Sequence, residues 1–253
     1  MEAPAEAVVA KPCSTCTACN TAHLVRLGIN VGGWDFVVAL AGNPNTGKST
    51  IFNALTGLRQ HVGNWPGKTV VRMEGSFAVN GKKYKVVDLP GTYSLLSTST
   101  DEEVARDFLL FGRPDVTVVV TDATRLERNL NLALQILEIT DRAVIALNLM
   151  DEARRHGLEV DARTLARDLG VPVVPMAARH GQGISELLHA IEEVAHGVYP
   201  AQPRRVRSFD SKLEAAVHTL TQQIEVTFPG LPNTRWVALR LLEGDESILR
   251  AVR

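Results

Sequence analysis

The sequence predicts an α/β protein in which a mostly parallel, six-stranded sheet is followed by a small all-helical domain. Three observations predict this class. Short apolar runs alternate with segments of helical periodicity, as in sheets that helices cover on both faces. A glycine-rich loop joins the first run to the first helical segment, and after about residue 200 the periodicity is helical only. We therefore expect a flexible tail over 1–34, a first domain over 35–198 and a helical domain over 204–253.

Six segments have the short, continuous or alternating apolar patterns of strands. They are residues 35–41, 69–79, 82–88, 116–121, 143–148 and 171–176. Asn80-Gly81 is a strong signal for a two-residue hairpin turn between the second and the third of them. The glycine-, asparagine- and proline-rich residues 57–68 and residues 89–100 are expected to be loops.

Helices are expected where apolar residues recur at helical spacing between start and stop signals. In the first domain these segments are 49–56, 101–111, 126–139, 160–169 and 184–196. The proline-containing residues 199–203 form a boundary, after which the expected helices are 210–227, 234–242 and 245–252. The last has no clear stop signal, so we expect the helical domain to be truncated.

Composition and charge exclude several classes of protein. The 253 residues are 45% hydrophobic and 22% charged, as in soluble globular proteins with one full core. The net charge of −1 offers no electrostatic reason to bind nucleic acid or an anionic membrane. No apolar stretch approaches the roughly 18–20 residues of a membrane helix, and no secretory signal is apparent. The cysteines are confined to one short stretch, which indicates a reducing, cytoplasmic setting.

Residues 42–50 are expected to bind phosphate. They contain the pattern G-x-x-x-x-G-K-[ST], whose backbone N–H groups point at phosphate oxygens where a helix begins. Lys48 is expected to reach the β- and γ-phosphates, and the Ser49 hydroxyl to bind Mg²⁺. An ordinary glycine-rich turn is the alternative, which the flanking strand and helix disfavour. The expected nucleotide contacts are Gly42, Asn43, Pro44, Asn45, Thr46, Gly47, Lys48, Ser49 and Thr50.

Asn148 and Asp151 are expected to select the base. They form the pattern N-x-x-D at the end of an expected strand, the edge where ligands bind to such sheets. The Asp151 carboxylate can accept two hydrogen bonds from guanine, which adenine cannot donate. Charged hydrogen bonds of roughly 1.5–3 kcal/mol each give a preference on the order of a hundredfold. A helix N-cap formed by Asp151 is the alternative.

Ala177 and Ala178 follow the last expected strand. In guanine-binding folds this position usually reads Ser-Ala-Lys/Arg, so a backbone N–H near Ala178 is expected to contact the guanine carbonyl. Ala177 replaces the usual serine, which is expected to loosen the base-binding loop and to favour fast release of nucleotide.

The pattern D-x-x-G at 88–91 completes the predicted nucleotide site. Asp88 is expected to hold Mg²⁺ through water, and the Gly91 N–H to sense the γ-phosphate. Thr69 is the expected second protein ligand to Mg²⁺. Five such elements in the correct order predict a Ras-like P-loop GTPase that binds GTP and GDP.

Four segments resemble the bacterial ferrous iron transport protein FeoB family: residues 42–49, 62–67, 87–95 and 101–106. Residues 63–67 are the most specific of them, and the resemblance covers roughly 35–253. It implies a GTPase domain and a helical domain often compared to a guanine-nucleotide dissociation inhibitor. The family continues into a polytopic membrane region, which is absent here.

The same resemblance implies a setting. GTP turnover would regulate ferrous iron transport at the cytoplasmic face of the bacterial inner membrane, with this fragment itself soluble. The implied partners are the membrane-spanning region of the same full-length protein and small Feo accessory proteins.

The resemblance also implies K⁺ at Asn45, helped by the backbone carbonyls of Gly63 and Trp65, with Gly67 in the nucleotide-binding set. A cation there would neutralise charge between the β- and γ-phosphates during cleavage. The residues expected to act in hydrolysis are Asn45, Lys48, Thr69 and Gly91.

Thr92 stands where Ras-like enzymes carry a water-orienting glutamine, and its hydroxyl is too short for that role. Glu102 and Glu103 are alternatives for positioning the water, although acids at a helix start are usually dipole complements. We expect slow intrinsic turnover, well under about 1 s⁻¹.

Cys13, Cys16, Cys19 and His23 form a separate cluster in the tail. Three thiols and an imidazole at this spacing can close a four-ligand shell around Fe or Zn. Free thiols in a flexible tail are the alternative.

Two further functions stay open from the sequence. One is a soluble, ribosome- or tRNA-associated K⁺-dependent GTPase, although the acidic residues of the last helices argue against a basic RNA-binding face. The other is a metal sensor in which the cysteine tail controls GTP turnover, which is compatible with the transport function.

Overall fold

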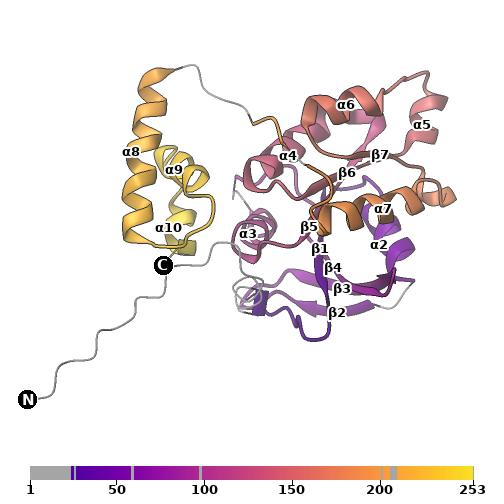
Figure 1. The fold of residues 1–253 in the computed structure, drawn as a ribbon, viewed down its shortest axis with the longest axis horizontal. Coiled ribbons are helices and arrows are strands. Elements are labelled where there is room, and N and C mark those ends of the chain that lie inside the picture. Colours follow the sequence, from indigo (N-terminus) through magenta and orange to yellow (C-terminus); the bar gives the residue numbers. More distant parts are fainter. Residues whose placement is uncertain are drawn as a thin grey trace, which may run out of the picture.

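The computed structural model describes residues 24–25, 27–57, 60–96, 99–200, 202–205 and 210–252. A seven-stranded sheet runs through the first part of the chain in the order β2-β3-β4-β1-β5-β6-β7 (Figure 1). The strands are β1 (Phe36–Gly42), β2 (Gln60–Asn64), β3 (Val71–Val79), β4 (Lys82–Asp88), β5 (Val116–Asp122), β6 (Ala143–Asn148) and β7 (Val173–Pro175). All neighbours pair in parallel except β2 with β3 and β3 with β4, so the predicted fold class is confirmed.

The sheet has seven strands rather than the predicted six because β2 lies inside the segment 57–68, which we expected to be a loop. Its sequence, Gln-His-Val-Gly-Asn, is mostly exposed and has no apolar alternation to read. Backbone pairing with β3, from Gln60 opposite Gly75 to Asn64 opposite Val71, forms this strand. Edge strands of this kind depend on a partner strand and carry little signal of their own.

The helices of the first part are α2 (Lys48–Thr56), α3 (Thr100–Asp107), α4 (Leu126–Ile139), α5 (Met150–Arg155), α6 (Ala162–Leu169) and α7 (Ile184–Ala195). Two details differ from the sequence prediction. The helix expected over 101–111 changes at Phe108 into a π-helix, η1 (Phe108–Gly112). The short α5 was not predicted, because one and a half turns are too few for a periodic pattern. Single turns of 3₁₀-helix lie at η2 (Ala123–Arg125) and η3 (Ala178–His180).

Alternation along the strands divides the core between the two faces of the sheet. Val38 and Leu40 of β1 pack with apolar residues of α2 and α7 on one face. Val37 and Ala39 pack with those of α3 and α4 on the other. Because both faces are buried, the strands read as continuous apolar runs. Because the central strands are parallel, their carboxyl ends meet at one edge of the sheet, where ligands bind in such folds.

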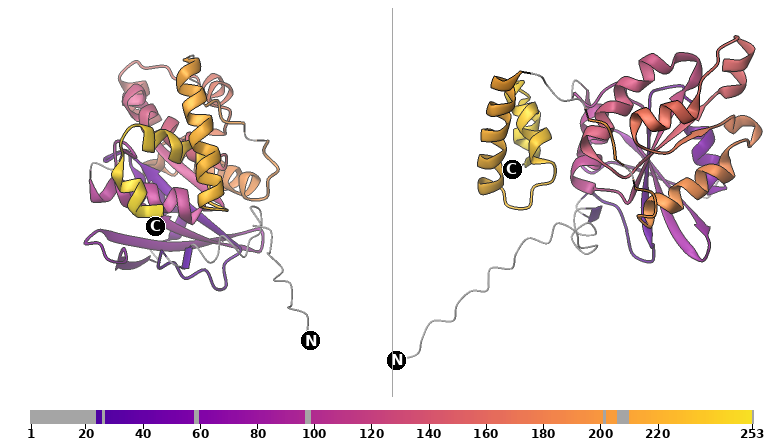
Figure 2. Two further views of the ribbon diagram at one scale, coloured as in Figure 1. Left: turned by 90° about the vertical axis from the view of Figure 1, so that its left-hand side faces the viewer. Right: turned by 45° about the horizontal axis from the view of Figure 1, so that its top comes forward.

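The helical part consists of α8 (Ser211–Thr227), α9 (Thr234–Leu242) and α10 (Glu246–Val252), close to the predicted ranges. These helices stand beside α3 in Figure 1. Trp236 and Ile248 belong to the same buried cluster as residues of α3 and α4, so an apolar seam joins the two parts. Figure 2 shows this arrangement from two further sides. Among the described residues, no helix is long and apolar enough to span a lipid bilayer.

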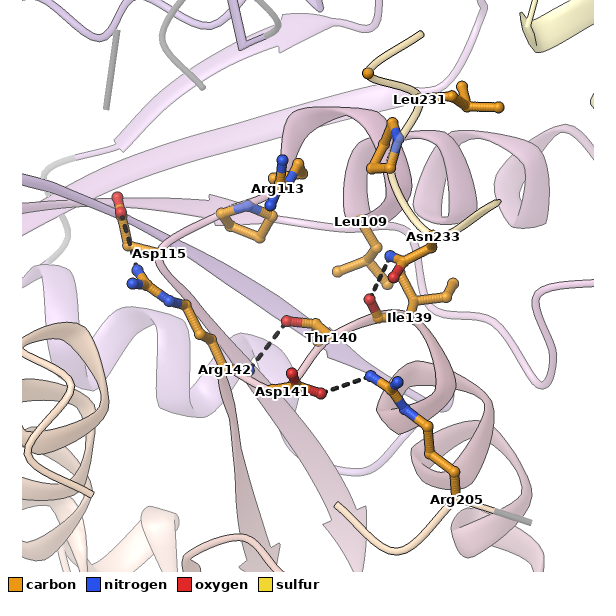
Figure 3. Close-up of a pocket in the computed structure, with 13 residues that line it drawn as sticks. Leu109, Arg113, Asp115, Ile139, Thr140, Asp141, Arg142, Arg205, Leu231 and Asn233 are labelled. Atoms are coloured by element: carbon orange, nitrogen blue, oxygen red, sulfur yellow. Dashed lines mark hydrogen bonds and ion pairs between the residues drawn. The ribbon is translucent and has the colours of Figure 1, made fainter. Parts of the chain in front are cut away.

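Polar contacts at the same junction surround a pocket of about 550 Å³ (Figure 3). The Asn233 side chain donates to the Ile139 carbonyl over 2.5 Å. Arg205 pairs with Asp141 at 2.5 Å, and Arg142 lies 3.6 Å from Asp115. Each of these two arginines therefore has a carboxylate partner.

Candidate functional site

The predicted phosphate loop connects β1 to α2, as its pattern requires. A side chain at Gly42 would bring its Cβ to 2.6 Å from the Val120 carbonyl oxygen. Gly47 has a φ of 85° as the N-cap of α2, and a Cβ there would overlap the Asn148 side-chain nitrogen. Both glycines are therefore required by close approach, and at Gly47 by backbone conformation as well. The Thr46 hydroxyl donates to the Asn43 carbonyl at 2.9 Å across the loop.

Lys48 and Asp88, predicted from separate motifs, meet at this loop. The Lys48 ammonium pairs with an Asp88 carboxylate oxygen and donates to the Leu89 carbonyl at 2.7 Å. Burial raises the pKa of Asp88, and the neighbouring Lys48 offsets only part of that rise. The two charges neutralise each other here, so a phosphate at Lys48 or a cation at Asp88 would replace this ion pair.

Asn148 ties the phosphate loop to the segment that follows β7. Its side chain is 2% exposed and donates from Nδ2 to the Thr46 carbonyl at 2.9 Å. Its Oδ1 accepts from the Ala178 backbone N–H at 3.0 Å. Ala178, which we expected to contact a base, thus has a hydrogen-bond partner within the protein. Asn148 fixes the relative position of two predicted nucleotide-binding segments.

Asp151 lies in the first turn of α5, whose N-cap is Leu149 without a side-chain cap. The alternative of an N-cap formed by Asp151 is therefore wrong. Its carboxylate is 2.9 Å from Arg155 Nη2 and 3.3 Å from His180 Nε2. Partial burial opposes ionisation, but hydrogen bonds from Arg155 and from backbone N–H groups outweigh it and lower the pKa of Asp151. The group therefore stays a hydrogen-bond acceptor at neutral pH.

The segment after Asp88 is anchored to both the loop and α3. The Thr92 N–H donates to the Gly42 carbonyl at 3.3 Å, and Gly91 lies against Pro44. The Ser94 hydroxyl donates to the buried Glu102 carboxylate at 2.8 Å. Glu103 instead pairs with Lys68 at 2.8 Å. Both acids considered for water positioning thus make contacts that hold loops to α3.

Residues 60–70 form a hairpin with β3, and this arrangement does not bring Gly63 and Trp65 to Asn45. Gly63 lies in β2 and pairs with Arg72 of β3. In the sheet, β3 and β4 lie between β2 and β1. Three strand spacings are about 14 Å. The Trp65 carbonyl accepts from the Lys68 N–H at 3.0 Å, while its ring packs edge-on against Phe108, with centroids 5.4 Å apart. The implied K⁺ ligands are therefore not assembled in this structure. Thr69 and Gly67 lie exposed in the turn of this hairpin.

The predicted metal cluster Cys13, Cys16, Cys19 and His23 lies outside the described residues. Within the part of the chain that the structure does describe, no group of three or more His, Cys, Asp or Glu side chains is placed to hold a metal ion. The tail cluster stays a prediction.

Three features of the site have no signal in the sequence: the bridge by Asn148, the Trp65–Phe108 contact, and a cavity on the α4 side of the phosphate loop. Each depends on residues far apart in the chain. The cavity has a volume of about 370 Å³, and Pro44, Tyr93 and Arg128 are among the residues that line it.

Comparison with known proteins places these residues in a family. The sequence model of "Ferrous iron transport protein B" matches residues 36–191, and that of the "FeoB cytosolic helical domain" matches residues 209–253. The "Fe(2+) transporter FeoB" of Salmonella typhimurium is 42% identical over 217 residues, which cover 82% of this chain. They cover 27% of that transporter, so the chain spans about a quarter of the length of this curated relative.

Solved structures are similar over most of the chain. The cytosolic domain of the T. maritima FeoB iron transporter in GDP form II has a TM-score of 0.78 and 38% identity, covering 86% of this chain and 85% of that one. The same domain in its GMPPNP form has a TM-score of 0.77 and 38% identity, with 86% and 84% coverage.

Proposed function

The chain belongs to the ferrous iron transport protein B (FeoB) family, and from this premise we propose that it binds guanine nucleotides and hydrolyses GTP slowly. The observation that carries the proposal is the meeting of three sequence-distant segments at one sheet edge. The loop 42–50, the Asp88 segment and the Asn148 segment are joined there by the Lys48–Asp88 and Asn148–Thr46 contacts. Relatives solved in GDP and GMPPNP forms support it.

Asp151 supports guanine over adenine as the base. Its carboxylate accepts hydrogen bonds, its pKa is lowered, and it lies three residues beyond Asn148, the last residue of β6. The N1–H and N2 amino groups of guanine donate to such an acceptor, whereas adenine offers no matching pair. The proposed nucleotide-binding set is the one predicted from sequence, from Gly42 to Thr50 with Gly67, Thr69, Asp88, Gly91, Asn148, Asp151, Ala177 and Ala178.

Ser49 at the phosphate loop, with an exposed side chain, and the Asp88 carboxylate are oxygen donors that suit Mg²⁺, and the Thr69 hydroxyl would join them once the β2–β3 hairpin opens. When bound, the ion would supply positive charge against the phosphate oxygens. The chain's own contribution is the orientation of Lys48 by the Leu89 carbonyl and the hydrogen bond that holds the Asp88 segment to Gly42. In this proposal Asn45, Lys48, Thr69 and Gly91 act on the triphosphate.

The K⁺ site rests on the family resemblance and on Asn45, an exposed residue of the phosphate loop with a φ of 65°. Gly63 and Trp65 lie in a hairpin away from it, so a complete K⁺ site requires that hairpin to open. We propose that K⁺ accelerates hydrolysis only after that rearrangement. Replacing KCl with NaCl at equal ionic strength tests this, and equal hydrolysis rates in the two salts would remove Asn45 from the role.

We further propose that nucleotide state is passed from the site to the helical domain through α3. At its start, Glu102 accepts a hydrogen bond from Ser94 of the segment after Asp88, and Glu103 pairs with Lys68 of the β2–β3 turn. At its end, Arg106 is 1% exposed and donates to Ser247 at 2.6 Å. One helix thus contacts both nucleotide-sensing segments and α10.

In the full-length protein this relay would regulate ferrous iron transport across the bacterial inner membrane, with the membrane-spanning region and small Feo proteins as partners. The proposed domains are residues 35–198 and 204–253.

Fe or Zn binding by the cysteine tail is a separate proposal. Elemental analysis after anaerobic addition of Fe²⁺ or Zn²⁺ tests it, and a protein that stays metal-free would end it. Family membership leaves the ribosome- or tRNA-associated alternative without support.

Calorimetric titration with GDP and ADP, each with Mg²⁺, tests the central proposal. We expect GDP to bind at least a hundredfold more tightly, because two charged hydrogen bonds to Asp151 distinguish the bases. Equal affinities for the two nucleotides, or no binding of either, would contradict the proposed function.

A further inference from the structure

We infer that the cavity on the α4 side of the phosphate loop is a second anion site, which takes the hydrogen phosphate that GTP cleavage releases. This inference rests on the proposed function. The cavity has a volume of about 370 Å³, large enough for one such ion with water. Asn43, Pro44 and Asn45 of the phosphate loop form one wall, and Arg125 and Arg128 from the start of α4 form another.

Two asparagines that line the cavity have unsatisfied polar atoms. Asn43 is 3% exposed and Asn129 is 4% exposed. The Asn43 Nδ2 donor and the Asn129 Oδ1 acceptor are buried without a hydrogen-bond partner among the described residues. Asn129 Nδ2 donates to the Arg125 carbonyl at 2.9 Å, which fixes which end of that amide is the free acceptor. Buried polar atoms rarely stay unpaired, so these two amides keep a donor and an acceptor that no described residue uses, directly behind the surface of the cavity.

The arginines of this cavity differ from those at the junction with the helical domain. There, Arg142 and Arg205 are neutralised by Asp115 and Asp141 (Figure 3). The Arg128 guanidinium instead lies 4.2 Å from the centroid of the Tyr93 ring. Neither Arg125 nor Arg128 has an ion-pair partner within the described part of the chain. Both residues are exposed, and two guanidinium groups without a carboxylate partner at one cavity favour an anion, since Arg binds phosphate oxygens well.

The remaining lining selects among anions. Asp122 and Glu152 also line the cavity, and Asp122 Oδ1 already accepts from the Thr124 N–H at 2.8 Å and from its hydroxyl at 2.7 Å. Carboxylates and the free Asn129 oxygen repel an anion that can only accept hydrogen bonds. Hydrogen phosphate carries a P–OH group that donates to such oxygens, whereas sulfate has none. The geometry therefore favours hydrogen phosphate over sulfate.

The position of the cavity connects it to the reaction. It shares the wall 43–46 with the predicted nucleotide site, and Tyr93 belongs to the segment that follows Gly91, the expected γ-phosphate sensor. Phosphate leaving the nucleotide would pass from one side of Pro44 to the other. Stacking of Arg128 on Tyr93 would then link occupancy of the second site to the position of that segment.

The test is a titration of ¹⁵N-labelled, GDP–Mg²⁺-loaded protein with sodium phosphate or sodium sulfate at equal ionic strength, followed by NMR chemical shifts. We expect saturable shifts at the side-chain amides of Asn43 and Asn129 with phosphate, and at least tenfold weaker binding of sulfate. The double variant R125Q/R128Q should bind phosphate at least tenfold more weakly, because it loses charged hydrogen bonds. The control R154Q/R163Q removes two exposed charges outside the cavity and should stay within about twofold of the wild type.

Affinity for fluorescent GDP is measured first and should be the same in all three proteins. A wild type that does not bind GDP would overturn the proposed function itself. If GDP binds but phosphate gives no saturable shifts, or R125Q/R128Q binds phosphate like the wild type, the second site is disproved alone. Equal binding of sulfate and phosphate would disprove the hydrogen-phosphate assignment and leave only non-specific anion attraction.

Discussion

At the scale of single residues, the glycines at the two ends of α2 distinguish two constraints that can require a glycine: a left-handed backbone and close packing against a neighbour. Gly47 and Gly57 both have left-handed backbones, with φ values of 85° and 57°. A Cβ at Gly47 would overlap Asn148, whereas nothing lies within 4 Å of one at Gly57. Backbone strain alone costs about 1–2 kcal/mol at such positions, so any larger effect at Gly47 comes from the loop–Asn148 contact.

Gly47→Ala is therefore expected to weaken GDP binding at least a hundredfold, because Asn148 must leave the loop and its hydrogen bonds. Gly57→Ala, the matched control, should lower the melting temperature by a few degrees and leave GDP affinity within about threefold of the wild type. Fluorescent-GDP titration and thermal unfolding measure the two effects. Equal loss of affinity in both variants would show that backbone strain, and not the Asn148 contact, controls the loop.

Asp151 gives a prediction about base choice. In Asp151→Asn the side chain gains an N–H donor, which matches the second carbonyl of xanthine and no longer accepts two hydrogen bonds from guanine. We expect affinity for GDP to fall by about a hundredfold and affinity for xanthosine diphosphate to rise, as competition against fluorescent nucleotide would measure. An unchanged ratio of the two affinities would remove Asp151 from base selection.

The same residue predicts how base choice depends on pH. Because the pKa of Asp151 is lowered from 3.8, the carboxylate is ionised throughout the range above that value. Preference for GDP over ADP should therefore be constant from pH 8 down to about pH 5, and should weaken only when the pH falls below 3.8. A loss of preference between pH 7 and pH 5 would indicate that another group, such as a histidine, selects the base.

At the scale of elements, the hairpin β2–β3 and the α3–η1 segment meet at Trp65. Its side chain is 4% exposed and packs edge-on against Phe108 of η1, and its indole Nε1 is buried without a partner among the described residues. An unsatisfied buried N–H costs about 1–3 kcal/mol, which reduces the stability of this packed position. The position is therefore one that the hairpin can leave when another contact offers a similar free energy.

We expect Trp65 to leave Phe108 when a GTP analogue and K⁺ bind. A W34F/W236F variant keeps Trp65 as the single tryptophan, so its fluorescence reports on this residue alone. GMPPNP in KCl should shift its emission to longer wavelength and increase quenching by acrylamide, relative to GDP in NaCl. An emission spectrum that is the same in both states, with nucleotide binding demonstrated, would show that the hairpin does not open.

At the scale of the whole molecule, one buried arginine joins the two parts of the chain. Arg106 of α3 contacts Asp107 at 2.6 Å, Ser247 at 2.6 Å and Asp245 at 3.8 Å. Asp245 in turn lies 3.3 Å from Arg240, within the helical part. Burial would raise the pKa of Asp245, but hydrogen bonds from Ser247 and Arg240 and the charge of Arg106 outweigh it and lower that pKa. These polar contacts fix how α3 and the helical part are aligned along the apolar seam.

Arg106→Leu is expected to lower the free energy of unfolding by about 3–5 kcal/mol, because it leaves Asp107 without a cationic partner and Asp245 with Arg240 alone. Hydrogen exchange should accelerate in α10 more than in β1 or β5. Arg154→Leu, a change at an exposed arginine, should alter stability by about 0.5 kcal/mol or less. Uniform acceleration across the sheet and α10 would indicate a general loss of stability without a specific role at the junction.

The sequence alone determined the order of six of the seven strands and of the longer helices, the phosphate loop, the N-x-x-D and D-x-x-G segments and the three terminal helices. These features depend on neighbours in the chain. Apolar periodicity, glycine positions and turn signals are local, and parallel strands bring their carboxyl ends to one edge whatever the rest of the fold does.

The tertiary structure alone decided the exposed edge strand β2, the π-helix after Asp107, the bridge from Asn148 to Thr46 and Ala178, and the placement of Trp65 away from Asn45. Each joins residues that are far apart in the chain or lack a periodic pattern. Sequence patterns report which face of an element is buried, but not which partner covers it. Partner choice follows from packing of the complete chain, and for that reason only the folded structure shows it.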